Sequence, residues 1–167
     1  MTMDAPHTRA AADQASGPVA AQHEAQRVAE AVREGMFRND RVAQQMGMHV
    51  SAIGPGSATV TMTVRADMLN GFAICHGGLV TTLADTAFAY ACNAYNDLTV
   101  ASGLSVDLLA PSHEGDVLTA IAHEVARTGR TGVYDVEVRN QRGERIAMFR
   151  GRSYCMKGRV VVQGLKT

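Results

Sequence analysis

The chain has 167 residues, of which 46% are hydrophobic and 19% charged, and its formal net charge at pH 7 is zero. This length allows one domain with a buried core and is short for two, and the composition is that of a globular protein rather than a disordered or fibrous one. The balanced charge excludes the strongly basic surface of a nucleic-acid binder, and no apolar run approaches the ~18 residues that a membrane span needs.

The N-terminal region lacks the apolar segment of a secretory signal, so we expect a cytoplasmic protein. Residues 1–22 are rich in small and polar side chains without periodicity, which predicts a mobile N-terminal tail. From 23 to 38, apolar residues recur every three to four positions, as in an amphipathic helix. A short second helix over 40–46, capped by Asp40, should follow.

Residues 57–64 alternate strictly between polar and apolar side chains, the pattern of a half-buried β-strand. Residues 48–53 can pair with this strand across the turn at 54–56. The two glycines of that turn do not make a phosphate-binding loop, because Thr59 stands where such a motif needs its third glycine. The segment therefore predicts a β-hairpin.

The longest apolar segment with helical periodicity covers 77–93. Four strand-like segments follow it at 99–109, 116–127, 131–140 and 145–156, separated by glycine and proline turns, and residues 158–167 are expected to form a C-terminal tail. This order indicates a single α+β domain over 23–157, in which an antiparallel sheet of five to six strands wraps around one central helix.

Two glycines follow a histidine at the start of the central helix, in the sequence His76-Gly77-Gly78. A helix N-terminus offers unpaired backbone N–H donors and the positive end of the helix dipole. Such donors can stabilise a carbonyl oxygen that gains negative charge during a reaction. A simple tight loop is the alternative interpretation of the same residues.

Asp85 lies in the middle of this helix between apolar neighbours, a position for which aspartate has poor helix propensity. A carboxylate in apolar surroundings needs a partner or a chemical role. A solvent-exposed outer face would be the alternative, but the helix is apolar on most of its surface. Asp85 is therefore the first candidate for a catalytic residue.

The stretch LNGFAICHGGLVTTLADTAFAYACN, followed by SVDLLAP and TGVYDVEV, resembles the PaaI-type hotdog thioesterases of phenylacetate degradation. The resemblance covers about 23–156 and implies the hotdog fold and hydrolysis of acyl-CoA thioesters. It implies that Asp85 is the catalytic carboxylate, that the Gly77 N–H polarises the thioester carbonyl, and that His76 and Asn70 line and support the site. Ser102 matches a position where some members carry a water-orienting hydroxyl.

The same resemblance implies aryl substrates, especially hydroxyphenylacetyl-CoA, released as free acid and CoA in phenylacetate catabolism. Gly77 and Asp85 are separated by ~12 Å along one helix at 1.5 Å per residue, so both cannot reach one thioester carbon. Two antiparallel copies could bring Gly77 of one chain opposite Asp85 of the other. We therefore expect a homodimer at minimum and a homotetramer as the full assembly.

The substrate-binding residues are less sharply defined. Arg127, Arg130 and Thr131 flank the turn at Gly129 and could bind the CoA phosphates, as could the arginines of the last strand, although ordinary surface charge would look the same. The acyl group should meet Phe72 and Met68 near Gly78, although the two large side chains could equally belong to the core.

No cofactor is expected, because CoA is part of the substrate, and no metal, because the histidines and cysteines lack ligand spacing. A Cys75–His76 nucleophile pair is disfavoured, since adjacent residues of an extended chain point to opposite sides. Two alternatives stay open. A hotdog hydratase or dehydratase would use His76 as its base, and a non-catalytic acyl-CoA binding protein would need no catalytic Asp85.

Overall fold

The computed structural model describes residues 10–165 and contains one six-stranded antiparallel sheet in the order β1-β2-β4-β5-β6-β3. Two helices precede the first hairpin, and the central helix follows it after a 3-10 turn at Ala66–Met68. The elements are α1 (Ala10–Phe37), α2 (Arg41–Gln45), β1 (His49–Gly54), β2 (Ser57–Thr63), α3 (Gly77–Asn93), β3 (Asp97–Leu108), β4 (Val117–Thr128), β5 (Thr131–Arg139) and β6 (Arg145–Val160).

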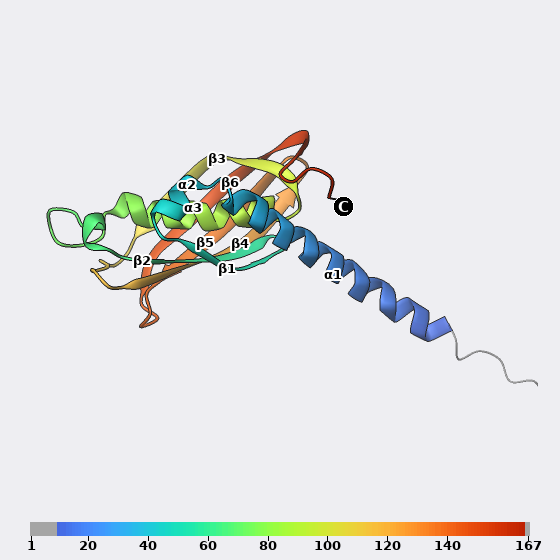
Figure 1. Cartoon of the computed structure of the whole chain (residues 1–167), viewed down its shortest axis with the longest axis horizontal. Helices are drawn as coiled ribbons and strands as arrows, with labels where there is room; N and C mark the ends of the chain where they lie inside the picture. The colour runs from blue at the N-terminus through green and yellow to red at the C-terminus, as the bar shows by residue number, and fades with distance from the viewer. Residues whose placement is uncertain (1–9, 166–167) are drawn as a thin grey trace, which may run out of the picture.

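The sheet curves around α3, which contacts all six strands (Figure 1). Alternation along the strands turns one face toward the helix, so that Val60 and Met62 of β2 and Val136 of β5 are buried. Phe88 of α3 lies with its ring centroid 5.5 Å from that of Tyr134. Burial of this apolar surface stabilises the fold by roughly 25 cal/mol per Å² removed from water. The hotdog arrangement predicted from the sequence is confirmed.

The central helix begins and ends where the periodicity predicts, and the cap of α2 is confirmed, since Asp40 Oδ1 accepts the Ala43 N–H at 3.0 Å. The N-terminal prediction differs from the structure. Helix α1 begins at Ala10 rather than near residue 23, and it extends well beyond the sheet (Figure 1). The rest of the predicted mobile tail, residues 1–9, lies outside the described residues.

The C-terminal residues are also more ordered than a tail. Strand β6 continues to Val160, and the next two residues are hydrogen-bonded to Asn96 just after α3. Sequence periodicity missed this extension because its contact lies 66 positions away in the chain. None of the described helices is long and apolar enough to cross a membrane.

Candidate active site

The N-terminus of α3 presents one backbone donor that has no partner. His76 is the N-cap, with extended backbone angles of −60° and 127°, and its Nδ1 accepts the Gly78 N–H at 3.1 Å. Among the hydrogen bonds of residues 10–165, none has the Gly77 N–H as donor. Gly77 is thus the available donor, whereas Gly78, predicted to bind substrate, has its N–H occupied by the cap.

The capping bond also defines the imidazole. A ring nitrogen that accepts a hydrogen bond cannot hold the proton, so neutral His76 carries its proton on Nε2. The lone pair that a hydratase base would need is engaged with Gly78. The adjacent thiol does not pair with the imidazole, because Cys75 Sγ faces the His76 carbonyl oxygen, and burial raises the pKa of Cys75.

Asn70 shapes the loop that leads to the helix. Its Oδ1 accepts the N–H groups of Phe72 at 2.9 Å and Ile74 at 3.4 Å, and Ala73 between them adopts a left-handed φ of 56°. Two further backbone bonds anchor the loop, from the Asn70 N–H to the Ile74 carbonyl and from the His76 N–H to the Met68 carbonyl. Asn70 therefore orders the loop that leads to Gly77, and its predicted role in the site stays a prediction.

A cavity of about 460 Å³ opens beside Gly77. Leu108 of β3 lies so close to Gly77 that a Cβ there would overlap its side chain, which explains a glycine at this position. The opposite wall is the loop after β3, where the Ser112 carbonyl accepts the Cys75 N–H at 2.8 Å. The cavity lining includes Asn70, Ile74, Cys75, Gly77, Leu108 and Ser112.

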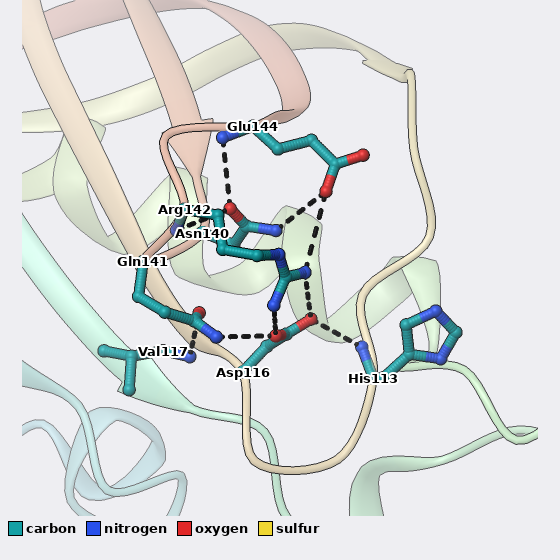
Figure 2. Close-up of polar contacts among 7 residues, drawn as sticks. All are labelled: His113, Asp116, Val117, Asn140, Gln141, Arg142 and Glu144. Carbon is teal, nitrogen blue, oxygen red and sulfur yellow. Dashed lines mark hydrogen bonds and ion pairs between the residues drawn. The ribbon is translucent and has the colours of Figure 1, made fainter.

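A buried carboxylate anchors the loop that carries Ser112 (Figure 2). Asp116 is 4% exposed and accepts hydrogen bonds from Arg142 Nη1 at 2.8 Å, Gln141 Nε2 at 2.9 Å and the His113 N–H at 2.9 Å. The bonds from Arg142 and His113 lower the pKa of Asp116 to about 2. The turn between β5 and β6 is thereby fixed to the wall of the Gly77 cavity.

Asp85 lies two turns along α3 and differs from the polar residues around it. The hydroxyl groups of Thr82 and Thr86 donate hydrogen bonds to the backbone carbonyls four residues earlier, at 2.8 Å each. Asp85 Oδ1, in contrast, is buried without a hydrogen-bond partner among the described residues. Desolvation raises the pKa of this carboxyl. Asp85 as a whole is half-buried, and a desolvated carboxylate oxygen without a partner is costly for folding, which is a reason to assign this residue a chemical function.

Asp85 borders a second cavity, of about 300 Å³ and mostly apolar. It lies between α1, α3, the start of β3 and the residues after β6, and it shares no lining residue with the Gly77 cavity. The two predicted catalytic groups therefore border separate cavities of one chain. The lining includes Met36, Phe88, Cys92, Leu98, Val100 and Val161.

Not all predicted substrate residues come together. Met68 is 3% exposed and belongs to the core, whereas Phe72 is 85% exposed at the tip of its loop, so the two form no acyl slot within one chain. Ser102 sits at a β-bulge of the exposed edge strand β3, and its hydroxyl donates to the Arg152 carbonyl at 3.1 Å. It lines neither the Asp85 nor the Gly77 cavity.

The residues predicted to bind CoA phosphates surround the β4–β5 turn and already have partners. Arg127 lies over the Tyr95 ring, 3.9 Å from its centroid, and Arg130 Nε donates to the Cys155 carbonyl at 3.1 Å. The Thr131 hydroxyl donates to the Thr128 carbonyl at 3.1 Å. These contacts are those of a structured surface turn and neither require nor prevent phosphate binding.

The cavity beside Asp85 was not predicted from the sequence. The sequence pattern placed Met36 on the apolar face of an amphipathic helix and Val161 in the predicted C-terminal tail. Only the tertiary fold brings them to α3, so no local pattern could have identified them. Within residues 10–165, no three His, Cys, Asp or Glu side chains are grouped so as to hold a metal ion.

Comparisons with known proteins identify the family of this chain. Residues 72–147 match the Thioesterase superfamily. The acyl-coenzyme A thioesterase PaaI of Escherichia coli K12 is 46% identical over 125 residues, which cover 75% of this chain and 89% of the relative. A putative esterase of Archaeoglobus fulgidus is 34% identical over 125 residues, which cover 75% of this chain and 81% of the relative.

The fold agrees as well. The structure of the E. coli PaaI protein from the phenylacetic acid degradation operon superposes with a TM-score of 0.76 at 45% identity, covering 83% of this chain and 97% of that one. A hypothetical thioesterase of Streptococcus pneumoniae, crystallised with coenzyme A, gives a TM-score of 0.64 at 25% identity, covering 67% and 90%. The chain therefore belongs to the PaaI family of hotdog acyl-CoA thioesterases.

Proposed function

We propose that this thioesterase hydrolyses aryl CoA thioesters of the hydroxyphenylacetyl type to the free acid and CoA, in phenylacetate catabolism. The observation that carries the proposal is the half-buried Asp85 at the edge of an apolar cavity, whose Oδ1 is buried without a hydrogen-bond partner among the described residues. The relative encoded in a phenylacetic acid degradation operon supports the pathway. The reaction needs no metal or cofactor, so activity should survive EDTA.

The size and chemistry of the Asp85 cavity support an aryl acyl group. Its volume of about 300 Å³ is at the lower end of the ~300–1,000 Å³ typical of ligand pockets. Phe88 and Met36 provide the flat and adaptable apolar contacts that an aromatic ring favours. This cavity replaces the Phe72 and Met68 slot predicted from the sequence.

Hydrolysis requires a second copy of the chain. The thioester carbonyl would accept the Gly77 N–H of one subunit while Asp85 of the other attacks the carbonyl carbon or activates water. The C–S bond breaks, the acyl group gains the hydroxyl of water, and the CoA sulfur leaves with a proton. Arg127, Arg130 and Thr131 remain candidates for the phosphates, and Ser102 for orienting water.

The edge strand β3 offers the surface for this assembly. Its outer edge is unpaired among the described residues, and Val100, Leu104 and Leu108 are each more than 40% exposed. An unpaired apolar edge favours pairing with an identical strand. We propose a homodimer through β3 as the minimal active unit, a homotetramer as the full assembly, and a cytoplasmic location.

The test is a hydrolysis panel of CoA thioesters with wild-type protein and the Asp85→Asn variant. We expect kcat/KM for phenylacetyl-CoA and hydroxyphenylacetyl-CoA to exceed that for aliphatic esters such as decanoyl-CoA by at least about tenfold, since the cavity is small. Faster hydrolysis of the aliphatic esters would overturn the aryl assignment. Crotonyl-CoA hydration in place of hydrolysis would overturn the reaction itself.

A further inference from the structure

We propose that the residues after β6 form a fixed wall of the acyl cavity, and that Val161, held there by Asn96, limits the size of the acyl group. This inference rests on the proposed function, because it takes the cavity beside Asp85 as the acyl site. It assigns a role in substrate selection to a segment that sequence reasoning regarded as a tail.

Asn96 holds the segment with three hydrogen bonds. Its backbone carbonyl accepts the Val161 N–H at 3.2 Å, its Oδ1 accepts the Val162 N–H at 2.8 Å, and its Nδ2 donates to the Val162 carbonyl at 3.1 Å. The side-chain amide thus pairs with both backbone groups of one residue, as a neighbouring strand would. Asn96 is 1% exposed and has a left-handed φ of 66°, a conformation that asparagine tolerates better than most residues.

Asn96 is itself fixed to the end of the central helix. It lies two residues after the C-cap Ala94, and its N–H donates to the Asn93 carbonyl at 2.9 Å. Asn93 in turn binds both backbone groups of Thr99 with its side chain, at 2.9 Å each. The C-terminal segment is therefore positioned by α3, the same helix that carries Asp85.

The segment also contacts α1, which provides another wall of the cavity. A Cβ on Gly35 would lie 2.6 Å from Cγ2 of Val162, a distance that no side chain could accept without movement. The next residue of the helix, Met36, lines the Asp85 cavity together with Val161. Glycine at position 35 thus lets the C-terminal segment pack against α1 with Val161 and Met36 both facing the acyl space.

If the Asn96 hydrogen bonds only ordered the end of the chain, their loss would affect stability and activity equally for all substrates. A cavity wall makes a different prediction, because a change in its volume alters large acyl groups more than small ones. The ratio of kcat/KM for phenylacetyl-CoA to that for acetyl-CoA therefore separates the two roles. A loss that is equal for both esters leaves this ratio unchanged.

The experiment compares Val161→Phe, which fills the cavity, with Val160→Phe as the matched control. Val160 is the adjacent residue, is 37% exposed and does not line the cavity. Val161→Phe should lower the ratio at least tenfold, whereas Val160→Phe should change it less than twofold. Asn96→Ala, which releases the segment, and the enlarging variant Val161→Ala should each raise kcat/KM for the longer ester decanoyl-CoA relative to that for phenylacetyl-CoA.

The outcomes also separate this inference from the proposed function. Wild-type protein could hydrolyse both esters in an Asp85-dependent manner while Val161→Phe leaves the ratio unchanged. The inference that Val161 limits acyl size would then be wrong, and the thioesterase assignment would stand. If wild-type protein hydrolyses neither, the proposed function fails. If circular dichroism shows that Val161→Phe does not fold, Val161→Leu replaces it. The ratio should then drop about threefold, and an unchanged ratio would overturn the inference.

Discussion

Among the polar residues of α3, Asp85 is the one whose proposed function would come at a cost in stability. The threonines of the helix donate to backbone carbonyls of the preceding turn, whereas Oδ1 of the half-buried Asp85 is desolvated and has no partner among the described residues. Because the pKa of Asp85 is raised in the fold, ionisation is less favourable there than in the unfolded chain. The resulting penalty is present above the folded pKa and disappears below the ordinary value near 4.

Asp85→Asn should therefore lower kcat by at least ~10²-fold while it raises Tm near pH 7, since the amide removes a buried charge and the nucleophile or base together. The gain in Tm should shrink as the pH is lowered toward 4, where the wild-type carboxyl becomes protonated. Kinetics and calorimetry over this pH range check both parts. A variant that retains more than a tenth of wild-type turnover would contradict the catalytic assignment.

The capping role of His76 leads to a second residue-scale prediction. His76→Ala frees the Gly78 N–H and should cost about 0.5–2 kcal/mol of stability, the usual loss for an N-cap. We expect kcat to fall about tenfold, because a frayed first turn displaces the Gly77 donor. Asn is a strong N-cap, so His76→Asn should restore both Tm and kcat. Recovery of Tm alone would show that the imidazole also contacts substrate.

At the scale of elements, patterns in the sequence predicted the features that depend on neighbouring residues. The alternation of β2 and the apolar periodicity of α3 fixed both element type and buried face, and the turn glycines separated the strands correctly. The strand order, the joining of α1 to the C-terminal segment and the cavity beside Asp85 depend on contacts between distant residues. Patterns within one window of sequence carry no information about such contacts.

Some residues of the candidate site could likewise be predicted from local sequence, and others could not. Asp85 and the Gly77 turn could be proposed from the chain, because a carboxylate inside a helix and a glycine turn before it are local features, whereas the roles of His76 and Asn70 came from the family resemblance. Phe72 and Met68 were assigned by proximity in sequence to Gly77, and the structure places one at the surface and the other in the core. The cavity that we propose for the acyl group lies instead beside Asp85, two helical turns from Gly77.

The Asp116 network predicts how a remote element supports the site. Asp116→Asn should cost about 1–3 kcal/mol, because the buried Asp116 carboxylate accepts several hydrogen bonds that a neutral amide cannot fully replace. The substitution should also lower kcat by loosening the Ser112–Cys75 contact. Asp135→Asn is the matched control, since Asp135 binds Arg150 at 2.6 Å on a more exposed surface. Exposed ion pairs contribute about 0–1 kcal/mol, so the control should keep nearly full activity.

The pH dependence of this network has a definite sign. The pKa of Asp116 is lowered to about 2 in the fold, so its stabilising contribution is fully present above the ordinary value near 4. That contribution is lost as the pH falls toward 2. The Tm difference between wild type and Asp116→Asn should thus be constant from pH 7 to 5 and decrease below about 4. A difference that grows on acidification would contradict the assignment.

At the scale of the whole molecule, the separation of Gly77 and Asp85 into two cavities is the basis for our proposal that each active site is shared between subunits. Gly77→Pro removes the N–H donor, and the position suits proline because it is the first residue of α3 and follows an extended residue. Gly77→Ala is the matched control, since it also overlaps Leu108 but keeps the N–H. The alanine variant should retain far more activity than the proline variant.

Mixing inactive Gly77→Pro subunits with inactive Asp85→Asn subunits should restore activity. In each mixed dimer one site combines an intact Gly77 N–H with an intact Asp85 carboxylate, and the other site combines both defects. Random pairing of equal amounts makes half of the dimers mixed, so about a quarter of wild-type activity is expected. Native mass spectrometry must first confirm that subunits have exchanged. Confirmed mixed dimers that remain as inactive as their parents would show that each chain holds a complete active site of its own.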